Sequence, residues 1–149
     1  MDSTNDSITV GVRQLADAPI PSYHTRGAAA FDLAAAADMV VAPGQLALVP
    51  TGLVFAVPDG HFMAIVARSS LARRGLLVAN GLGVLDSDYR GPADEAKILV
   101  LNYTPAPVTI AKGDRLAQAF VLHVPRVTFV PLTHDDTDGS RGGFGSTGS

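Results

Sequence analysis

The last nine residues of the chain, 141–149, combine residue types that can close over a nucleotide. Glycine and serine allow backbone N–H groups to approach an anion closely, and the guanidinium of Arg141 fits a phosphate. The ring of Phe144 can cover a base. The same composition is also typical of an unstructured Gly/Ser linker. The tail alone therefore leaves two interpretations open, a nucleotide clamp and a flexible end.

A second candidate segment, 80–91, runs from a short apolar stretch into two acids, an aromatic residue and a glycine. In an extended chain Asp86 and Asp88 point to the same side and can bind a cation. Tyr89 then points to the opposite side, where its ring can form the wall of a pocket. An ordinary Asp-rich turn accounts for the same residues equally well.

The elements that must position these segments are predicted to be β-strands. Short runs rich in Val, Leu, Ile and Phe alternate with turn dipeptides such as Pro43-Gly44 and Asp59-Gly60, which predicts strands joined by hairpins. The expected strands are 39–41, 46–49, 53–57, 61–67, 96–102, 108–110, 117–124 and 127–130. Their spacing is typical of a sandwich or barrel, so the fold class is predicted to be all-β.

Two segments are ambiguous between helix and strand. Residues 28–37 are rich in alanine, which favours a helix, but the alternation around Phe31 allows a strand, and a strand is our prediction. Residues 69–75 predict a short helix, because serines suit an N-cap, arginines occupy the last turn and Gly75 follows. The start of this helix, beside Arg68, is a candidate anion site.

Composition limits the classes of function. A chain of 149 residues predicts one domain, and 47% hydrophobic against 17% charged residues favours a homo-oligomer. A net charge of -3 without a basic run argues against a nucleic-acid partner. Without cysteine, an apolar run of membrane-spanning length or a signal-like N-terminus, the expected location is the cytoplasm. The apolar pattern stops near Thr133, which predicts a packed domain at 1–132 and a mobile arm at 133–149.

Five separated segments together resemble the trimeric deoxyuridine triphosphate nucleotidohydrolases, the dUTPases. They read AFDL at 30–33, RSSLA at 68–72, GVLDSDYRG at 83–91, GDRLAQ at 113–118 and GGFGSTG at 142–148. Their order and spacing are similar to those of the family over essentially the whole chain. The resemblance implies a distorted jelly-roll subunit with one short helix, and a homotrimer with active sites between subunits. It also implies hydrolysis of dUTP to dUMP and pyrophosphate with Mg²⁺, which limits uracil incorporation into DNA and supplies dUMP for thymidylate synthesis.

The resemblance implies a catalytic role for three residues and an indirect metal contact for a fourth. Asp86 matches the acid that orients and deprotonates the water attacking the α-phosphorus, and Gln118 the amide that helps to hold that water or the adjoining phosphate. Ser69 matches the hydroxyl that donates toward the bridging oxygen. Magnesium is expected to take its ligands from phosphates and waters, with Asp32 touching those waters from the outer shell.

The remaining implied contacts bind the substrate. Residues 80–89 are expected to form a hairpin that accepts uracil along its backbone, while Tyr89 excludes a 2′-hydroxyl and Phe144 stacks on the base. The substrate-binding residues implied in this way are Arg68, Ser69, Ser70, Asn80, Gly83, Val84, Leu85, Asp86, Tyr89, Lys97, Gln118, Arg141, Phe144, Gly145, Ser146 and Thr147.

The chain departs from the family pattern at three places. Ser70 stands where the family usually has glycine, and Gly139 stands where the tail arginine is expected, so we hypothesise that Arg141 replaces that arginine. An insertion, Pro92-Ala93-Asp94, precedes Glu95 and affects the carry-over of Lys97 to a contact on the base side.

Two other functions fit parts of the pattern. A dCTP deaminase shares the subunit fold, but its chemistry needs an acid/base group facing the base ring, and 80–89 contains no glutamate. A non-catalytic protein that responds to dUTP would keep the fold without the chemistry. The four histidines have no metal-ligand spacing and are expected to be structural or superficial; they are His24, His61, His123 and His134.

Overall fold

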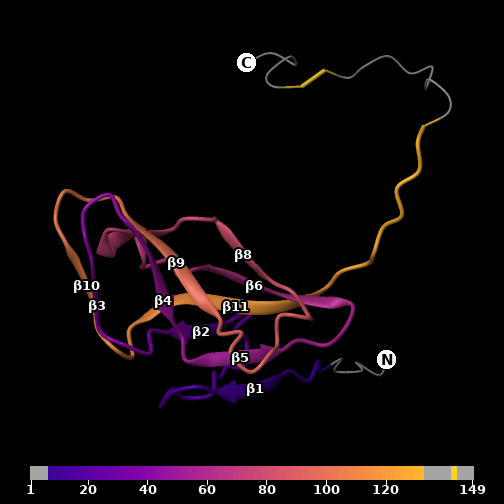
Figure 1. Cartoon of the computed structure of the whole chain (residues 1–149), viewed down its shortest axis with the longest axis horizontal. Helices are drawn as coiled ribbons and strands as arrows, with labels where there is room; N and C mark the ends of the chain where they lie inside the picture. Colours follow the sequence, from indigo (N-terminus) through magenta and orange to yellow (C-terminus); the bar gives the residue numbers. More distant parts are fainter. Residues whose placement is uncertain (1–6, 133–141, 144–149) are drawn as a thin grey trace.

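The computed structural model describes residues 7–132 and 142–143 of the chain (Figure 1). The strands are β1 (Gly11–Gln14), β2 (Phe31–Ala34), β3 (Met39–Val41), β4 (Leu46–Pro50), β5 (Leu53–Ala56), β6 (His61–Ala67), β7 (Leu76–Val78), β8 (Leu82–Leu85), β9 (Lys97–Asn102), β10 (Val108–Ile110) and β11 (Arg115–His123). A single 3₁₀ turn, η1 (Ala72–Arg74), is the only helical element in this part of the chain. The all-β prediction is confirmed, and no described helix is long and apolar enough to cross a membrane.

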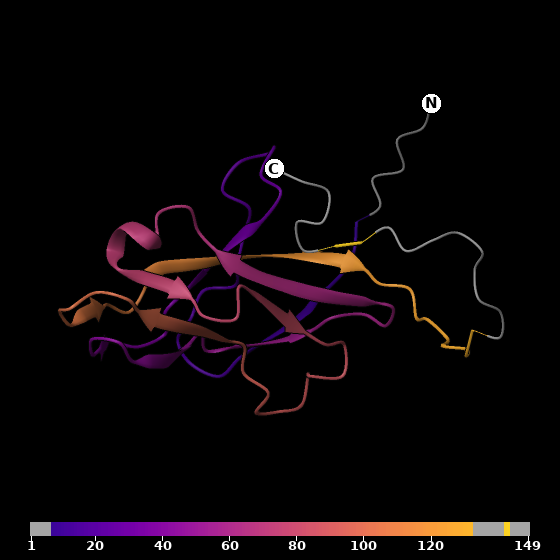
Figure 2. The same cartoon turned by 90° about the horizontal axis from the view of Figure 1, so that it is seen from above.

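The strands form four antiparallel sheets in which no strand pairs with its neighbour in sequence. The orders are β1-β5, β10-β3, β2-β11-β6-β8 and β4-β9-β7. The turns at Gly44 and Gly60 lie where expected, each with a positive φ. The predicted hairpins are nevertheless wrong, because each turn carries the chain into a different sheet. The long strands β6 and β11 lie side by side (Figure 2).

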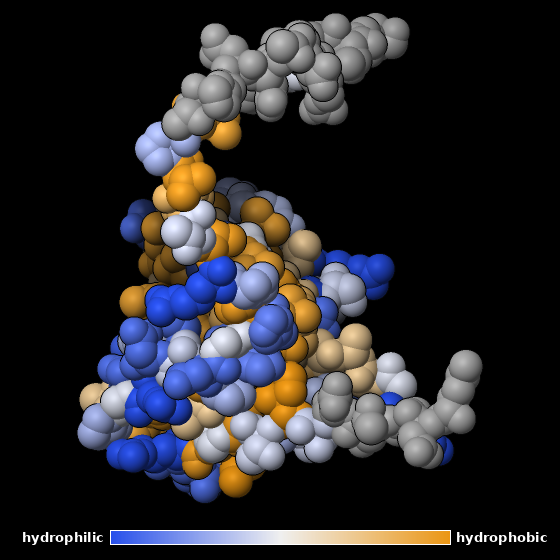
Figure 3. All heavy atoms as spheres, turned by 90° about the vertical axis from the view of Figure 1, so that its right-hand side faces the viewer, coloured by the Kyte–Doolittle hydropathy of each residue, from blue (hydrophilic) through white to orange (hydrophobic). Residues whose placement is uncertain are grey.

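Two strand predictions had opposite outcomes. The alanine-rich segment does contain a strand, β2, because pairing with β11 and burial of Leu33 outweigh helix propensity. The strand predicted at 127–130 is wrong. Residues 124–132 leave the sheets as an exposed segment, and its apolar side chains, including Phe129 at 90% exposure, stand clear of the body (Figure 3). A strand needs a partner, and the described residues supply none there.

The short helix predicted at 69–75 is reduced to one 3₁₀ turn. Its N-cap is Leu71, which makes no side-chain cap hydrogen bond, so the predicted serine cap is wrong. Leu71 is 1% exposed, and burial of this side chain anchors the turn instead. The C-terminal prediction is confirmed, since Arg73 and Arg74 occupy the last turn and Gly75 ends it in the left-handed conformation with φ 85°.

The sheets enclose an apolar core that includes Leu33, Phe55, Met63, Ile98 and Leu116. A second apolar surface faces outward from the β4-β9-β7 sheet. We call it the leucine face; its members are Leu46, Leu48, Leu77, Leu99 and Leu101. Leu46 and Leu48 are 60% and 56% exposed, so this face has no cover within the described chain. A row of adjacent leucines of this kind is typical of a protein–protein contact.

Candidate functional site

The candidate site is built around β11, which lies between β2 and β6. Gln118 on β11 is opposite Asp32 on β2 and Val66 on β6. Directly opposed residues of antiparallel strands project to the same face of the sheet. The Gln118 amide and the Asp32 carboxylate are therefore neighbours because the strand register makes them so.

A β-bulge adds a further residue to this face. The register of β11 against β2 shifts between Arg115 and Ala117, so that Arg115 is opposite Ala34 while Gln118 is opposite Asp32. Residues 115 and 118 would project to opposite faces of a regular strand. Because Asp32 and Ala34 share a face of β2, the bulge brings Arg115 to the face that carries Gln118.

Asp32 binds two arginines at once. Its Oδ1 lies 3.0 Å from Nε of Arg68, and its Oδ2 lies 3.1 Å from an Nη atom of Arg115. Arg68 also donates a hydrogen bond of 3.2 Å to the Arg115 carbonyl oxygen. These contacts hold two guanidinium groups side by side while leaving each partly exposed, which concentrates positive charge where a phosphate can reach it. Arg115 was not singled out from the sequence, because a bulge has no signature in the motif that contains it.

Ser69 and Ser70 follow Arg68 in an exposed turn. The Leu71 N–H donates to the Arg68 carbonyl oxygen at 3.0 Å, and the buried Leu71 side chain fixes the end of this turn. Both serines are thus exposed directly after Arg68 in the chain.

The other half of the predicted constellation lies beyond β8. Asp86 starts a turn that the Tyr89 N–H closes by donating to the Asp86 carbonyl oxygen at 3.2 Å. Of the two interpretations of this segment, the turn is therefore confirmed and the extended geometry is wrong. The uracil hairpin expected at 80–89 is also not observed as two paired strands. β8 pairs with β6, and the strand before it, β7, pairs with β9. Asn80 and Gly81 instead form the turn that links two sheets.

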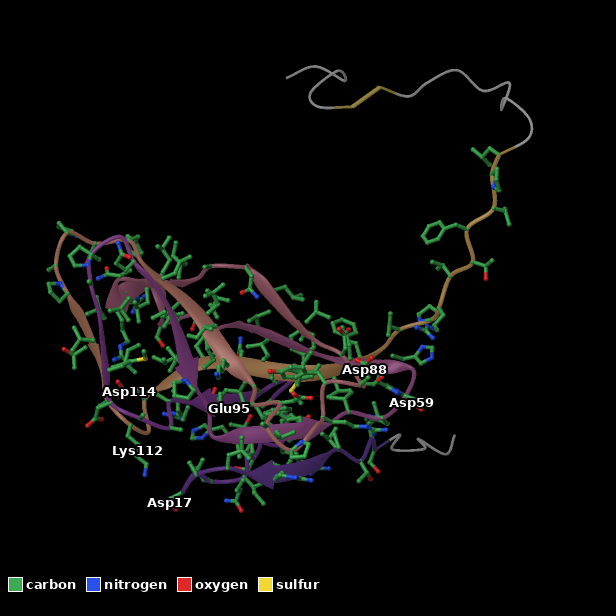
Figure 4. The ribbon with its side chains drawn as sticks, viewed as in Figure 1. Asp17, Asp59, Asp88, Glu95, Lys112 and Asp114 are labelled. Atoms are coloured by element: carbon green, nitrogen blue, oxygen red, sulfur yellow. The ribbon has the colours of Figure 1, made fainter. Side chains whose placement is uncertain are left out.

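A single chain does not bring the two halves together. Leu85 is opposite Met63 in the β6–β8 ladder, so Asp86, the next residue, lies at the level of residue 62 on β6. Residue 62 is six positions from Arg68 along the chain. Six residues of strand span about 20 Å. Figure 4 agrees, since Asp88 lies at one end of the molecule and Asp114, next to Arg115 in sequence, lies toward the other end. Lys97 starts β9 in a different sheet, opposite Pro50.

The tail residues predicted to bind substrate fall outside the described residues. They are Arg141, Phe144, Gly145, Ser146 and Thr147. A hollow of ≈ 510 Å³ that the sequence did not indicate reaches the β2 side of the site, where Asp32 and Arg115 form part of its wall. The segment containing Tyr23 and His24 forms another part.

The described residues offer magnesium an indirect contact only. No three His, Cys, Asp or Glu side chains of residues 7–132 and 142–143 group closely enough to hold a metal ion. Asp32 already accepts from two guanidinium groups, but each carboxylate oxygen has a second lone pair for a water. This donor set suits an ion whose ligands come mainly from phosphates and waters, as Mg²⁺ prefers at nucleotide sites.

Asp114 fixes the turn from which β11 starts. Its carboxylate accepts from the Ala111 N–H at 2.9 Å and from Arg74 at 2.6 Å. The hydrogen bond from the Ala111 backbone and then that from Arg74 lower the pKa of Asp114 below its ordinary value. This turn immediately precedes Arg115 and the bulge.

Comparison with known proteins identifies relatives of one kind. The dUTPase family model matches residues 16–148. A deoxyuridine 5'-triphosphate nucleotidohydrolase of Thermobifida fusca is 44% identical over 146 residues, which cover 95% of this chain and 80% of that protein.

Solved structures agree. A dUTPase from Streptococcus mutans has a TM-score of 0.74 at 28% identity and covers 80% of this chain and 99% of its own. A mutant dUTPase of Staphylococcus bacteriophage 80alpha, solved with dUpNHpp, has a TM-score of 0.83 at 20% identity. It covers 96% of this chain and 100% of its own, and at this identity it supports the fold alone. The predicted jelly-roll architecture is confirmed.

We predict an acid-sensitive contribution of Asp114 to stability. Because its folded pKa is lowered, the charged form stabilises the fold above the unfolded pKa of about 4, and this contribution is lost as pH falls through the folded pKa. Asp114→Asn should therefore lower the free energy of unfolding by about 1 kcal/mol at pH 7. Its deficit relative to the original chain should shrink below pH 4 in urea titrations at fixed protein concentration. Asp59→Asn, at an exposed turn, is the control; a deficit for Asp114→Asn that stays constant down to pH 2.5 would contradict the assignment.

Proposed function

The chain belongs to the dUTPase family, and on that premise we propose that it hydrolyses dUTP to dUMP and pyrophosphate. The observation that carries the proposal is the cluster in which Asp32 holds Arg68 and Arg115 beside Gln118. Such a cluster offers two forked cations and an amide to a triphosphate from one rigid sheet. The reaction would limit uracil incorporation into DNA and supply dUMP, in the cytoplasm.

On the phosphate side, each group has a separate task. Arg68 and Arg115 neutralise phosphate charge, and Asp32 keeps their planes in place before substrate arrives. The Ser69 hydroxyl donates toward the bridging oxygen as it takes up charge in the transition state. Ser70, exposed in the same turn, supplies a second hydroxyl where a glycine would supply only backbone. Gln118 holds the attacking water or the adjoining phosphate.

Asp86 is proposed as the base that orients and deprotonates the attacking water. A carboxylate is a weak base, so its value lies in holding the water in line with the α-phosphorus, an effect worth up to roughly 7 to 11 kcal/mol. Asp86 is exposed at the start of a closed turn, accessible to a ligand outside its own chain.

Magnesium, when bound, would neutralise phosphate charge and fix the conformation of the triphosphate. Asp32 is the described residue that suits it, through an intervening water. The Asp32 side chain is 23% exposed, and its two carboxylate oxygens contact the two arginines.

Uracil recognition is assigned to β8 and the turn before it. β8 is an edge strand, paired with β6 alone among the described strands, so the backbone of Gly83, Val84 and Leu85 can offer donors and acceptors on its free side. A Cβ at Gly83 would lie 3.5 Å from the amide nitrogen of Asn80, which puts that amide against the strand. Polar groups matched to uracil would be left unpaired by cytosine, and Tyr89 would exclude a ribose hydroxyl.

We propose that the complete site is shared between copies in a homotrimer. The separation of about 20 Å between the arginine cluster and Asp86 along the sheet is too large for one nucleotide to be held by both in the same chain. A second copy can supply Asp86 and β8 to the arginine cluster of the first. The leucine face provides an apolar surface for such an association.

The tail is proposed to close over the bound nucleotide. Residues 133–149 form the arm and 1–132 the catalytic domain. Phe144 would stack on uracil, with Arg141, Ser146 and Thr147 reaching the outer phosphates, and Gly145 would add a further substrate contact. Lys97 would add a contact on the base side. Closure would expel water and strengthen the charge contacts inside.

The function is tested by a nucleotide panel. We expect pyrophosphate release from dUTP with Mg²⁺, a large loss without it, and roughly 10⁴-fold lower kcat/KM for dCTP because its pairing groups do not match. UTP and dTTP should also be poor substrates. Ammonia release from dCTP would instead indicate a deaminase. Binding of dUTP without any product would indicate a non-catalytic receptor.

Asp86→Asn should bind dUTP with an affinity within a few-fold of the original chain but lose turnover by about 10²- to 10⁴-fold, because an amide cannot accept the proton from water. Calorimetry measures the first quantity and pyrophosphate release the second. Asp88→Asn, in the same turn, is the matched control and should keep most of the turnover. If Asp86→Asn turned over normally, the base would lie elsewhere.

Removal of the residues after Asp138 should leave the oligomer intact and nearly abolish turnover, because the phosphates and base would stay open to water. Light scattering gives the molar mass, and the panel assay gives the rate. Deletion of residues 1–6, which carry no proposed site residue, is the control and should keep the rate. A truncated arm with unimpaired turnover would exclude the closing role.

A further inference from the structure

The insertion Pro92-Ala93-Asp94 is folded into a closed turn. The Gly91 N–H donates to Oδ2 of Asp94 at 2.7 Å, and the Asp94 N–H donates back to the Gly91 carbonyl oxygen at 3.2 Å. A Cβ at position 91 would lie 2.8 Å from the same Oδ2, so a side chain there would displace the Asp94 carboxylate. The three added residues therefore loop out, and the chain on either side of them stays close.

Glu95, directly after this turn, is fastened to the body. Its Oε1 accepts from the Gly52 N–H at 2.7 Å, and the N–H of the next residue, Ala96, donates to the Leu53 carbonyl oxygen at 2.8 Å. Ala96 is 1% exposed, so this connection is anchored in the core. In Figure 4 Glu95 lies near the middle of the molecule.

The fastened residue holds Tyr89. The Tyr89 hydroxyl donates to the Glu95 carbonyl oxygen at 3.2 Å, while the Tyr89 N–H closes the turn from Asp86. The aromatic residue is thus held at both its backbone and its tip, yet 40% of it remains exposed. A ring held in this way presents a fixed surface to a ligand.

We propose that Asp94 and Glu95 are positioning residues for Tyr89, and that they set the discrimination between deoxyribose and ribose. The inference rests on the proposed function, in which Tyr89 excludes the 2′-hydroxyl. Asp94 holds the inserted turn closed, the closed turn sets where the Glu95 carbonyl lies, and that carbonyl sets the position of the ring. If the ring is held less firmly, it can move to admit a 2′-hydroxyl, and the preference for dUTP over UTP falls. If the loop only stabilises the fold, its disruption lowers activity on both nucleotides alike.

The test compares kcat/KM for dUTP and for UTP in four variants. Asp94→Ala removes the cap and Tyr89→Phe removes the hydrogen bond at the ring tip. Each should lower the dUTP-to-UTP ratio roughly three- to tenfold, the factor that one neutral hydrogen bond allows. Asp94→Asn keeps an acceptor for Gly91 and should keep the ratio. Tyr103→Phe removes a comparable tyrosine hydrogen bond to the Ala72 carbonyl and should also keep it.

An equal loss of activity on both nucleotides in Asp94→Ala, or an unchanged ratio in Tyr89→Phe, would overturn the proposal. A second readout does not depend on turnover. The chain contains three tyrosines, so labelled tyrosine rings give few NMR signals, and Tyr89→Phe identifies the one from position 89. Asp94→Ala should shift that signal and Asp94→Asn should not; a signal that stays in place would refute the coupling. Should the unmodified chain fail to hydrolyse dUTP, the proposed function fails, and this NMR result still decides whether Asp94 positions the ring.

Discussion

The geometry of the candidate site depends on the β-bulge at the start of β11. Without the extra residue, Arg115 would project to the face opposite that of Gln118, and Asp32 would have one guanidinium partner instead of two. The bulge sits between the turn fixed by Asp114 and the part of β11 that is paired on both sides. This local distortion, held by regular structure on one side and a closed turn on the other, places the two guanidinium groups to which the proposed function assigns phosphate binding.

The β2-β11-β6-β8 sheet also explains why the arginine cluster and Asp86 lie apart within one chain. Every strand pairing joins segments that are distant in sequence, and the antiparallel register sends the end of β8 away from the end of β6 that carries Arg68. Asp86 and Tyr89 therefore belong to a separate turn, which its own backbone hydrogen bond closes. Glu95 connects this turn to Gly52 in the body of the domain. The two halves lie apart within one chain, and the proposed association of copies through the leucine face would bring them together between chains.

Much of the fold was predictable because turn chemistry is local. Positive-φ glycines at positions 44 and 60 mark the strand ends correctly, and Leu33, the buried residue of β2, belongs to the alternation around Phe31 from which a strand was predicted. Pairing partners are not local, which is why the expected hairpins are wrong. For the same reason the apolar pattern at 127–130 predicts a strand, although the described chain offers that segment no partner.

The candidate site was predictable in its residue types but not in its arrangement. Motif order and spacing identify Asp32, Arg68 and Gln118, which the register then brings together. Arg115 was missed because only the bulge turns it toward Asp32, and a bulge depends on how two strands meet. The sequence indicated an insertion before Glu95 but not its conformation, and a single carboxylate closes it into a turn. The ion pairs of Asp32 depend on strand register, and the inserted turn depends on one side-chain cap, so the motifs indicate the residue types but do not describe their arrangement.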